Sequence, residues 1–480
     1  MIFGWLEGGA FTMLVVFVHG WSVTNTDTYG GLPAALVKNA SAKLGLRVTH
    51  LYLGKYVSFA DEVKVDDIAR GMQQAIATEV LPKLAKGERF ACITHSTGGP
   101  VVRKWIDLYH RGKLDKCPLG HLIMLAPANH GSALAQLGKG RIARMKFFAD
   151  DVEPGTGVLD WLELGSNQSW ELNREWLAYH CVARGLYPFV LTGQKIDRAF
   201  YDNLNAYTDE AGSDGVVRVA AANLNYGLIR LVQTDGDLDL KRDERSAKTA
   251  FGVLPGRSHS GATIGILASV KADDSGSHPT VLWVLRCLEV GSATAYNRLV
   301  KQLEELTAKT QKDEREDTER QLFVFKRTFV TNRYCMLVIR IMDDRGNDLS
   351  DYDVLFTAGP GYDPNHLPPG FFVDRQRNQL NPGKLTYYID YDVMNDWLSK
   401  PELAGKFGVR ITARPAAGFA YYTAAEHKGA FAALKRYFEP NQTLMVEVEL
   451  RRRVVEGVFR LTQDLAAENF KDQPKGADIP

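Results

Sequence analysis

Residues 90–99, FACITHSTGG, form the stretch that decides the fold of this chain. The apolar run 90–94 has the composition of a buried strand, and residues 101–109 have that of a helix. Ser96 stands at the bend between them, and Gly98 follows two positions later. A serine on such a sharp strand-to-helix turn is a nucleophile elbow, whose usual pattern is G-x-S-x-G. Gly98 fits this pattern, whereas Thr94 replaces the first glycine, so the match is partial.

Short apolar runs and helical patterns alternate on both sides of this stretch, up to about residue 290. The expected strands are 14–18, 46–53, 90–94, 121–125, 187–192 and 216–220, and the clearest other helix is 65–84. Strands that alternate with helices indicate a mostly parallel sheet with helices on both faces. We therefore predict an α/β domain over residues 1–295.

The last third of the chain has a different pattern. Residues 296–321 are highly charged and lack glycine and proline, which predicts an exposed connector helix. From 322 to 455, runs with period-two apolar spacing are separated by turn residues, which indicates an all-β domain resembling a sandwich. Residues 456–480 have the composition of a disordered tail.

Composition excludes several classes of protein. The chain has 480 residues with 58 basic and 57 acidic side chains, so the total shows no basic excess for a nucleic-acid partner. No apolar run approaches the roughly 18 residues that span a bilayer. The N-terminus lacks the basic segment of a signal peptide, which predicts synthesis in the cytoplasm. The five scattered cysteines form no metal-binding pattern and favour a reducing compartment.

Several segments together resemble α/β-hydrolases of the lipase type. Gly20, Ser96 and Gly98 fit that family, and residues 125–132, LAPANHGS, resemble its segment after the next strand. The resemblance covers residues 13 to about 290. It implies the α/β-hydrolase fold and a Ser–Asp–His triad in that chain order, with Ser96 as the nucleophile. Such chemistry needs no metal and no cofactor.

The resemblance also implies an oxyanion hole made of two backbone N–H groups. One comes from the loop after the first strand and one from the residue after the nucleophile, which are Trp21 and Thr97 here. His19 and Gly20 immediately precede Trp21, and we expect them to support this loop. His95 is expected to support the elbow.

Two aspartates compete for the role of the catalytic acid. Residues 213–217, SDGVV, resemble a lipase motif in which an aspartate precedes a strand, and this favours Asp214. Asp197 is the alternative, because it lies five residues beyond the expected strand 187–192, a more usual position for the acid. Asp202 and Asp209 are weaker candidates.

The chain order favours His259 as the catalytic base among 11 histidines. It lies in residues 256–261, GRSHSG, after Asp214 and before an expected helix at 262–270. His278 is interpreted as the first residue of another helix, and His130 precedes the acid in the chain. The sequence therefore predicts the triad Ser96, Asp214 and His259.

Two insertions bear on the substrate. Residues 133–185 carry the tryptophans Trp161, Trp170 and Trp176 together with Phe147 and Phe148. They form either a lid over an apolar acyl site or the core of a cap. Residues 221–250, apolar and then charged, either touch a lipid interface or form an exposed hairpin. A lipid ester, with phospholipid as the leading expectation, is the predicted substrate.

The whole arrangement resembles lipase and phospholipase toxins of the type VI secretion system. That resemblance implies export by a specialised system, transient contact with a membrane surface, and an immunity protein or secretion-machinery component as partner. One alternative is a cytoplasmic carboxylesterase that acts on soluble esters. Another is a hydrolase-fold binding protein in which Ser96 is idle.

Overall fold

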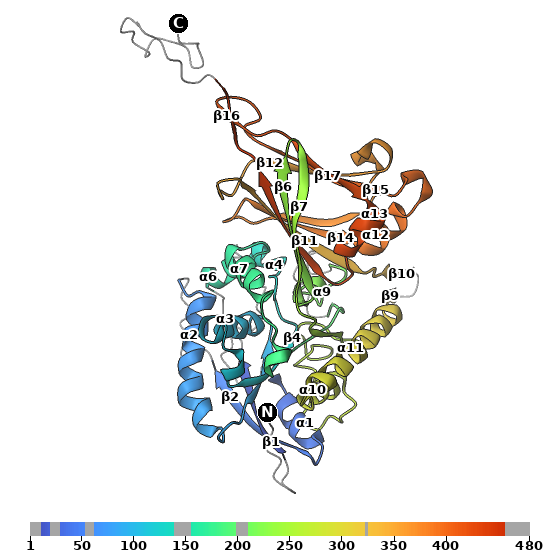
Figure 1. The fold of residues 1–480 in the computed structure, drawn as a ribbon. Coiled ribbons are helices and arrows are strands. Elements are labelled where there is room, and N and C mark those ends of the chain that lie inside the picture. The colour runs from blue at the N-terminus through green and yellow to red at the C-terminus, as the bar shows by residue number, and fades with distance from the viewer. Residues whose placement is uncertain are drawn as a thin grey trace, which may run out of the picture.

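The computed structural model describes residues 11–19, 29–52, 62–138, 155–197, 210–321 and 325–456. Figure 1 shows an α/β domain below a large β domain, with the short helix α9 (Val219–Ala222) where the two meet. Within these ranges no helix is long and apolar enough to cross a membrane.

The α/β domain is built on a six-stranded sheet in which all pairs of neighbouring strands are parallel. In spatial order the strands are β2 (Leu44–Tyr52), β1 (Phe11–His19), β3 (Phe90–His95), β4 (Leu119–Leu125), β5 (Tyr187–Thr192) and β8 (Ala250–Val253). The strands are continuous apolar runs because helices cover both faces of the sheet. β3 lies in the interior of the sheet, so the elbow after it sits at the centre of the carboxyl edge.

Helices on the two faces belong to two separate apolar clusters. One face is covered by α2 (Val65–Ala75), α3 (Gly98–His110), α6 (Thr156–Leu162) and α7 (Asn167–Trp176). The other face is covered by α1 (Leu32–Asn39), α10 (Pro279–Leu288) and α11 (Ala293–Asp313). A short helix, α4, spans Leu134–Gly138, and a π-helical turn, Ile76–Val80, continues α2.

Two elements of the α/β region differ from their predicted form. Residues 216–220 are not a strand: they form a tight turn after Asp214 that leads into α9. The charged segment 296–321 is not an exposed connector helix, because α11 buries Leu299 and Leu303 against the sheet and contacts β8. Charged residues occupy only its outer face, and the apolar side chains recur at helical spacing on the inner one.

The β domain is one curled, nine-stranded mixed sheet rather than two packed sheets. In spatial order its strands are β12 (Tyr352–Ala358), β15 (Lys406–Ala413), β17 (Ala425–Ala430), β7 (Asp237–Arg245), β6 (Tyr226–Thr234), β18 (Thr443–Leu450), β11 (Tyr334–Asp343), β14 (Lys384–Asp390) and β13 (Phe372–Arg377). The curl brings the two edges together, since the rings of Phe356 in β12 and Phe372 in β13 are 5.3 Å apart. The concave face encloses an apolar core.

The β6–β7 hairpin comes from the insertion 221–250, and it lies in the middle of this sheet. β6 pairs with β18 along seven residue positions, and β7 makes one pairing with β17. The segment is therefore an integral part of the β sheet and not a free-standing hairpin, and β7 keeps one exposed face. The β domain thus takes two strands from the region predicted to belong entirely to the hydrolase domain.

The convex side of the β sheet shares a core with the α/β domain. Along β11, Met336 and Val338 pack into the cluster that contains α3 and α9, whereas Leu337 and Ile339 point into the β-domain core. This alternation is the period-two pattern of a strand that is buried on both faces. The two domains are therefore packed together and not joined by a free linker.

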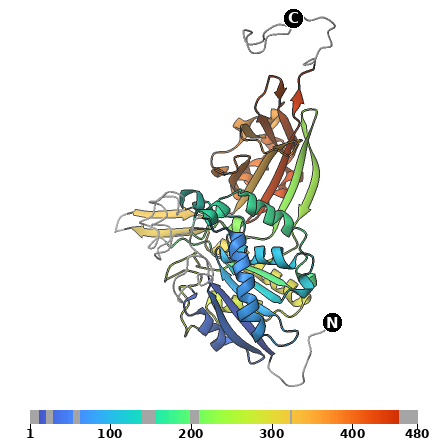
Figure 2. The same cartoon turned by 90° about the vertical axis from the view of Figure 1, so that its left-hand side faces the viewer.

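Smaller elements complete the described fold. They are the helices α12 (Tyr391–Leu398) and α13 (Phe431–Leu434), the pair β9 (Glu316–Gln321) and β10 (Phe325–Val330), and the pair β16 (Ala420–Tyr421) and β19 (Arg453–Val454). Figure 2 shows β9 and β10 reaching out sideways from the junction of the two domains.

Candidate active site

Ser96 occupies the tight turn between β3 and α3. Its φ of 51° lies in the left-handed region, which is strained for a residue with a side chain. The Ser96 N–H donates to the carbonyl of Leu125 at 3.0 Å, which holds the turn against β4. A Cβ atom on Gly98 would lie 3.1 Å from Thr94 Cβ. Thr94 is therefore accommodated in place of the usual glycine because Gly98 leaves room for its buried side chain.

His259 connects the serine to Asp214. The distance from Ser96 Oγ to His259 Nε2 is 3.1 Å, and His259 Nδ1 is 3.0 Å from Asp214 Oδ2. The His259 backbone N–H also donates to the Asp214 carbonyl at 2.8 Å. Both side chains are buried, which strengthens these interactions by excluding water. The structure thus brings together the three residues that the sequence selected.

Backbone donors fix the other oxygen of the Asp214 carboxylate. Asp214 Oδ1 accepts hydrogen bonds from the N–H groups of Val216 at 3.0 Å and Val217 at 2.8 Å. Gly215, with a φ of 98°, allows the chain to turn sharply enough for this contact. Only Oδ2 is left to face the imidazole, so the orientation of the carboxylate is set by the turn.

The competing aspartates do not share this position. Asp197 is buried beside the loop that follows His259, where a Cβ on Gly261 would lie 2.1 Å from Asp197 Oδ2. Among the hydrogen bonds of the described residues, the partner of the His259 imidazole is Asp214 and not Asp197. Asp202 and Asp209 lie outside the described residues.

His95 contacts the base directly. Its Nε2 lies 3.2 Å from the His259 carbonyl oxygen, and the two rings are 4.6 Å apart. Burial, and then the neighbouring His259, hold the pKa of His95 well below its usual range. His95 is therefore neutral at pH 7, and its Nε2–H donates to the carbonyl. This contact steadies the backbone of the loop that carries His259.

The predicted oxyanion donors are described only in part. Thr97 immediately precedes α3, and its N–H has no hydrogen-bond acceptor among the described residues. A helix N-terminus with a free N–H favours negative charge. Gly20 and Trp21 lie outside the described residues, and so does the side chain of His19, at the end of β1.

Two solved structures resemble this chain along almost its whole length. Phospholipase PlaB from Legionella pneumophila in complex with thio-NAD is 51% identical with a TM-score of 0.87, and the match covers 98% of this chain and 100% of that chain. A second structure of the Legionella phospholipase is 52% identical with a TM-score of 0.88, covering 97% and 98%. This chain belongs to the PlaB family. A scan against protein-family models gives no match, nor does a search of curated proteins.

Membership of the PlaB family confirms two predictions. The fold is an α/β-hydrolase domain with a C-terminal β domain, and the chain is a carboxylic ester hydrolase. The comparisons give no support to the resemblance to type VI secretion effectors, which stays a prediction.

Arg103, near the site around Ser96, is a residue that the sequence analysis did not single out. This α3 side chain is fully buried, and its guanidinium contacts the side-chain oxygens of Asn129 at 3.2 Å and Asn173 at 2.8 Å. Burial lowers the pKa of Arg103 to about 10. The loop that contains Asn129 also touches the elbow, since the Ala128 N–H donates to the Ser96 carbonyl at 3.4 Å. An arginine in an apolar helix gives no sequence signal of such contacts.

The three tryptophans of the insertion 133–185 belong to the core of the α/β domain. They are Trp161, Trp170 and Trp176, each at most 3% exposed and packed in the cluster shared with α3. Phe147 and Phe148 lie outside the described residues. The tryptophans therefore stabilise the domain instead of lining an open acyl groove.

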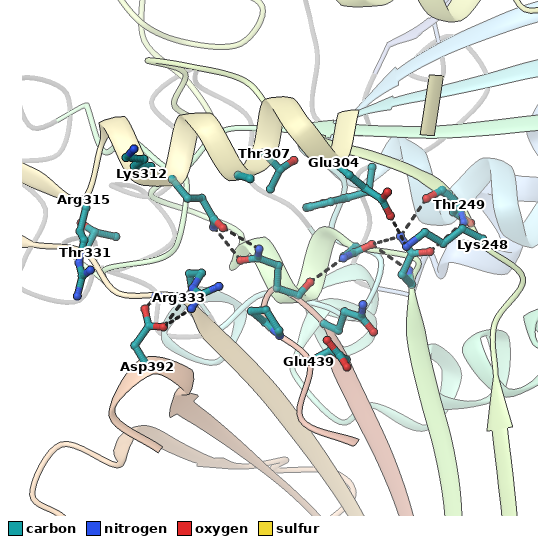
Figure 3. A pocket seen from close by; sticks show the side chains of 18 residues that line it. Lys248, Thr249, Glu304, Thr307, Lys312, Arg315, Thr331, Arg333, Asp392 and Glu439 are labelled. Carbon is teal, nitrogen blue, oxygen red and sulfur yellow. Dashed lines mark hydrogen bonds and ion pairs between the residues drawn. The ribbon is translucent and has the colours of Figure 1, made fainter. Parts of the chain in front are cut away.

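A cavity of about 500 Å³ lies away from the triad, below α11 and beside the β domain. Figure 3 shows Lys312 and Arg315 at one end of it and Lys248 and Glu304 at the other. Lys248 pairs with Glu304, whereas Lys312 and Arg315 form no ion pair among the residues whose side chains the structure describes. Among all described residues, the cavity included, no group of three or more histidine, cysteine or acidic side chains could hold a metal ion.

Proposed function

We propose that this chain hydrolyses the carboxylic esters of phospholipids, with Ser96 as nucleophile, His259 as general base and Asp214 as the acid that orients the base. The observation that carries the proposal is the continuous contact from Ser96 Oγ through His259 to Asp214, with distances of 3.1 and 3.0 Å. A binding protein with an idle serine would have no need for this buried alignment. The phospholipid substrate rests on the Legionella enzyme, which is 51% identical.

The hydrogen bonds around His259 determine its tautomer. Asp214 Oδ2 can only accept, so the neutral imidazole carries its proton on Nδ1, and Nε2 keeps a lone pair toward Ser96. Nε2 takes the hydroxyl proton as the serine oxygen attacks the ester carbonyl. Asp214 then stabilises the imidazolium that forms.

The remaining steps follow from the same geometry. The tetrahedral oxyanion is held by the N–H of Thr97, with Trp21 as the second proposed donor. When the intermediate collapses, the imidazolium gives its proton to the departing alcohol of the lipid, and an acyl-enzyme remains on Ser96. His259 then activates a water molecule that releases the fatty acid.

Substrate length tests the lipid assignment. Purified protein should cleave vesicle phospholipid, and its rate on simple esters should rise from C2 toward longer acyl chains, because each buried methylene adds about 0.8 kcal/mol of binding. Ser96→Ala should abolish both activities, and the control Ser277→Ala, which removes an exposed hydroxyl outside the triad, should keep them. A preference for C2–C4 esters without vesicle hydrolysis would instead favour the soluble-ester enzyme.

We also propose that the chain binds a nicotinamide dinucleotide, since the similar Legionella structure is a complex with thio-NAD. The cavity below α11 is the candidate site: its 500 Å³ lies within the range of small-molecule sites, and Lys312 and Arg315, which form no ion pair with any side chain that the structure describes, offer positive charge suited to a pyrophosphate. Isothermal titration calorimetry with NAD tests this. Arg315→Ala should weaken binding, whereas Lys309→Ala, at an exposed position of the preceding helix α11, should not; equal affinity in both variants rules out the site.

A further inference from the structure

The segment that carries Asp214 lies between the two domains. From Gly212 to Asn225 every residue except Val216 is buried, although the segment contains only the four-residue helix α9. Such an irregular segment needs partners outside itself for its backbone groups. The hydrolase domain supplies some of them, for example the His130 N–H, which donates to the Ala221 carbonyl at 2.9 Å.

The β domain supplies partners for the residues just before Asp214. The hydroxyl of Tyr388, on β14, lies 3.2 Å from the carbonyl oxygen of Ala211 and 3.0 Å from that of Gly212, two residues before the acid. The Gly212 carbonyl also accepts from the Val219 N–H at 3.0 Å, which closes the turn around Asp214. The Tyr388 hydroxyl therefore binds the same carbonyl that closes the turn.

Close packing leaves no room for a side chain at Gly212. Gly212 has a φ of 74°, and a Cβ there would lie 2.2 Å from Tyr334 Cδ2 and 2.4 Å from the Tyr388 hydroxyl. The two tyrosine rings stack with their centroids 4.9 Å apart. The Asp214 turn thus rests directly on two aromatic side chains of the β domain.

Arg218 makes a second connection on the far side of the turn. Its side chain is 1% exposed, and its guanidinium pairs with Glu210 at 2.6 Å, with Asp374 on β13, and with the face of the Tyr388 ring at 4.2 Å. Farther along, Thr443 Oγ1 donates to the Ala220 carbonyl at 2.9 Å. β-domain contacts therefore occur both before and after the acid.

We infer that the β domain is part of the catalytic apparatus, with Tyr388 as a positioning residue that sets the Asp214 turn and so the distance from Asp214 Oδ2 to His259 Nδ1. This inference rests on the proposed triad. Tyr388 touches no reacting atom and acts only through the turn. The β domain thereby has a role in the α/β domain's chemistry that does not depend on binding lipid.

The test compares three variants of the full chain. Tyr388→Phe removes the hydroxyl and keeps the ring between Tyr334 and Arg218. Asp374→Asn weakens the second connection. Tyr352→Phe is the matched control, because that hydroxyl donates at 3.0 Å to the Pro382 carbonyl, elsewhere in the β domain. Initial rates on one ester are measured from pH 4.5 to 9, and the folded fraction is checked by thermal unfolding.

A carboxylate held less firmly stabilises the imidazolium less. Tyr388→Phe should therefore lower kcat by roughly 10- to 100-fold with little change in KM, the scale expected for a catalytic group displaced by about 1 Å. The acid limb of its pH profile should move to lower pH. Asp374→Asn should change both in the same direction by less, and Tyr352→Phe should match the wild type.

Asp214→Asn, measured alongside, separates the two possible failures. If Asp214→Asn is inactive while Tyr388→Phe keeps the wild-type kcat and pH profile, the inference is wrong and the triad stands. A lower rate in Tyr388→Phe with an unmoved acid limb would mean only a loss of folded protein, which also overturns it. Near wild-type activity in Asp214→Asn would overturn the triad itself.

Discussion

Replacing Asp214 with asparagine reverses the polarity of the contact with His259. In the native turn, Oδ1 accepts two backbone hydrogen bonds, from Val216 and Val217, at 3.0 and 2.8 Å. An asparagine keeps those bonds only by placing its oxygen there, which turns its NH₂ group toward His259. The amide then donates to Nδ1, so the imidazole must carry its proton on Nε2.

That tautomer cannot accept the proton of Ser96. The Nε2–H would face the serine oxygen across the 3.1 Å contact, and the enzyme would have no general base. We expect kcat/KM to fall by about 10⁴-fold, the scale of this change in other serine triads. That corresponds to about 5 kcal/mol of lost transition-state stabilisation. The fold should survive, because the backbone contacts of the turn remain.

The assay is the initial rate of ester hydrolysis by purified Asp214→Asn, compared with Asp197→Asn. Asp197 lies against Gly261 and not against the imidazole, so its amide variant should stay within a few-fold of wild type. Labelling by a fluorophosphonate should slow in parallel for Asp214→Asn only. A rate for Asp214→Asn within ten-fold of wild type, or a loss confined to Asp197→Asn, would refute the reasoning.

Three further predictions concern stability, positioning and export. Burial lowers the pKa of His130 to about 3, so at pH 5 only the unfolded chain gains this proton. Stability should then fall as the pH drops below about 6.5, by about 2 kcal/mol at pH 5 from this histidine; urea unfolding of His130→Phe should show a smaller fall. Arg103→Met should lose the contacts to Asn129 and Asn173 and lower kcat about ten-fold at unchanged KM, in steady-state assays, as expected of a displaced loop. If the chain acts as an exported phospholipase, directing it to the periplasm of a bacterium should slow growth, and Ser96→Ala should not; equal growth of the two strains would contradict that role.

The sequence predicted the parts of the site that depend on local pattern and chain order. The elbow at Ser96 follows from a strand, a small residue and a helix, and Asp214 and His259 follow from their order in a family with a fixed order. The partial match at Thr94 has a steric explanation that no local pattern contains, namely the space left by Gly98.

Contacts between distant segments were outside the reach of such reasoning. The β6–β7 hairpin has the alternation of any strand pair, and nothing local indicates that β18, some 200 residues later, pairs with it. The charged helix α11 appeared exposed because its charges outnumber the few apolar residues of its buried face. Tyr388 and Arg103 act through backbone groups and amides of other elements, so neither has a recognisable motif.

The most direct measurement is to map the residue that a fluorophosphonate modifies, with and without phospholipid vesicles. The account predicts a single adduct on Ser96 by tandem mass spectrometry, and slower labelling when vesicle phospholipid competes for the site. It also predicts no adduct in Ser96→Ala. An adduct on another serine, or labelling of Ser96 that phospholipid leaves unchanged, would contradict the claim that this serine attacks lipid esters.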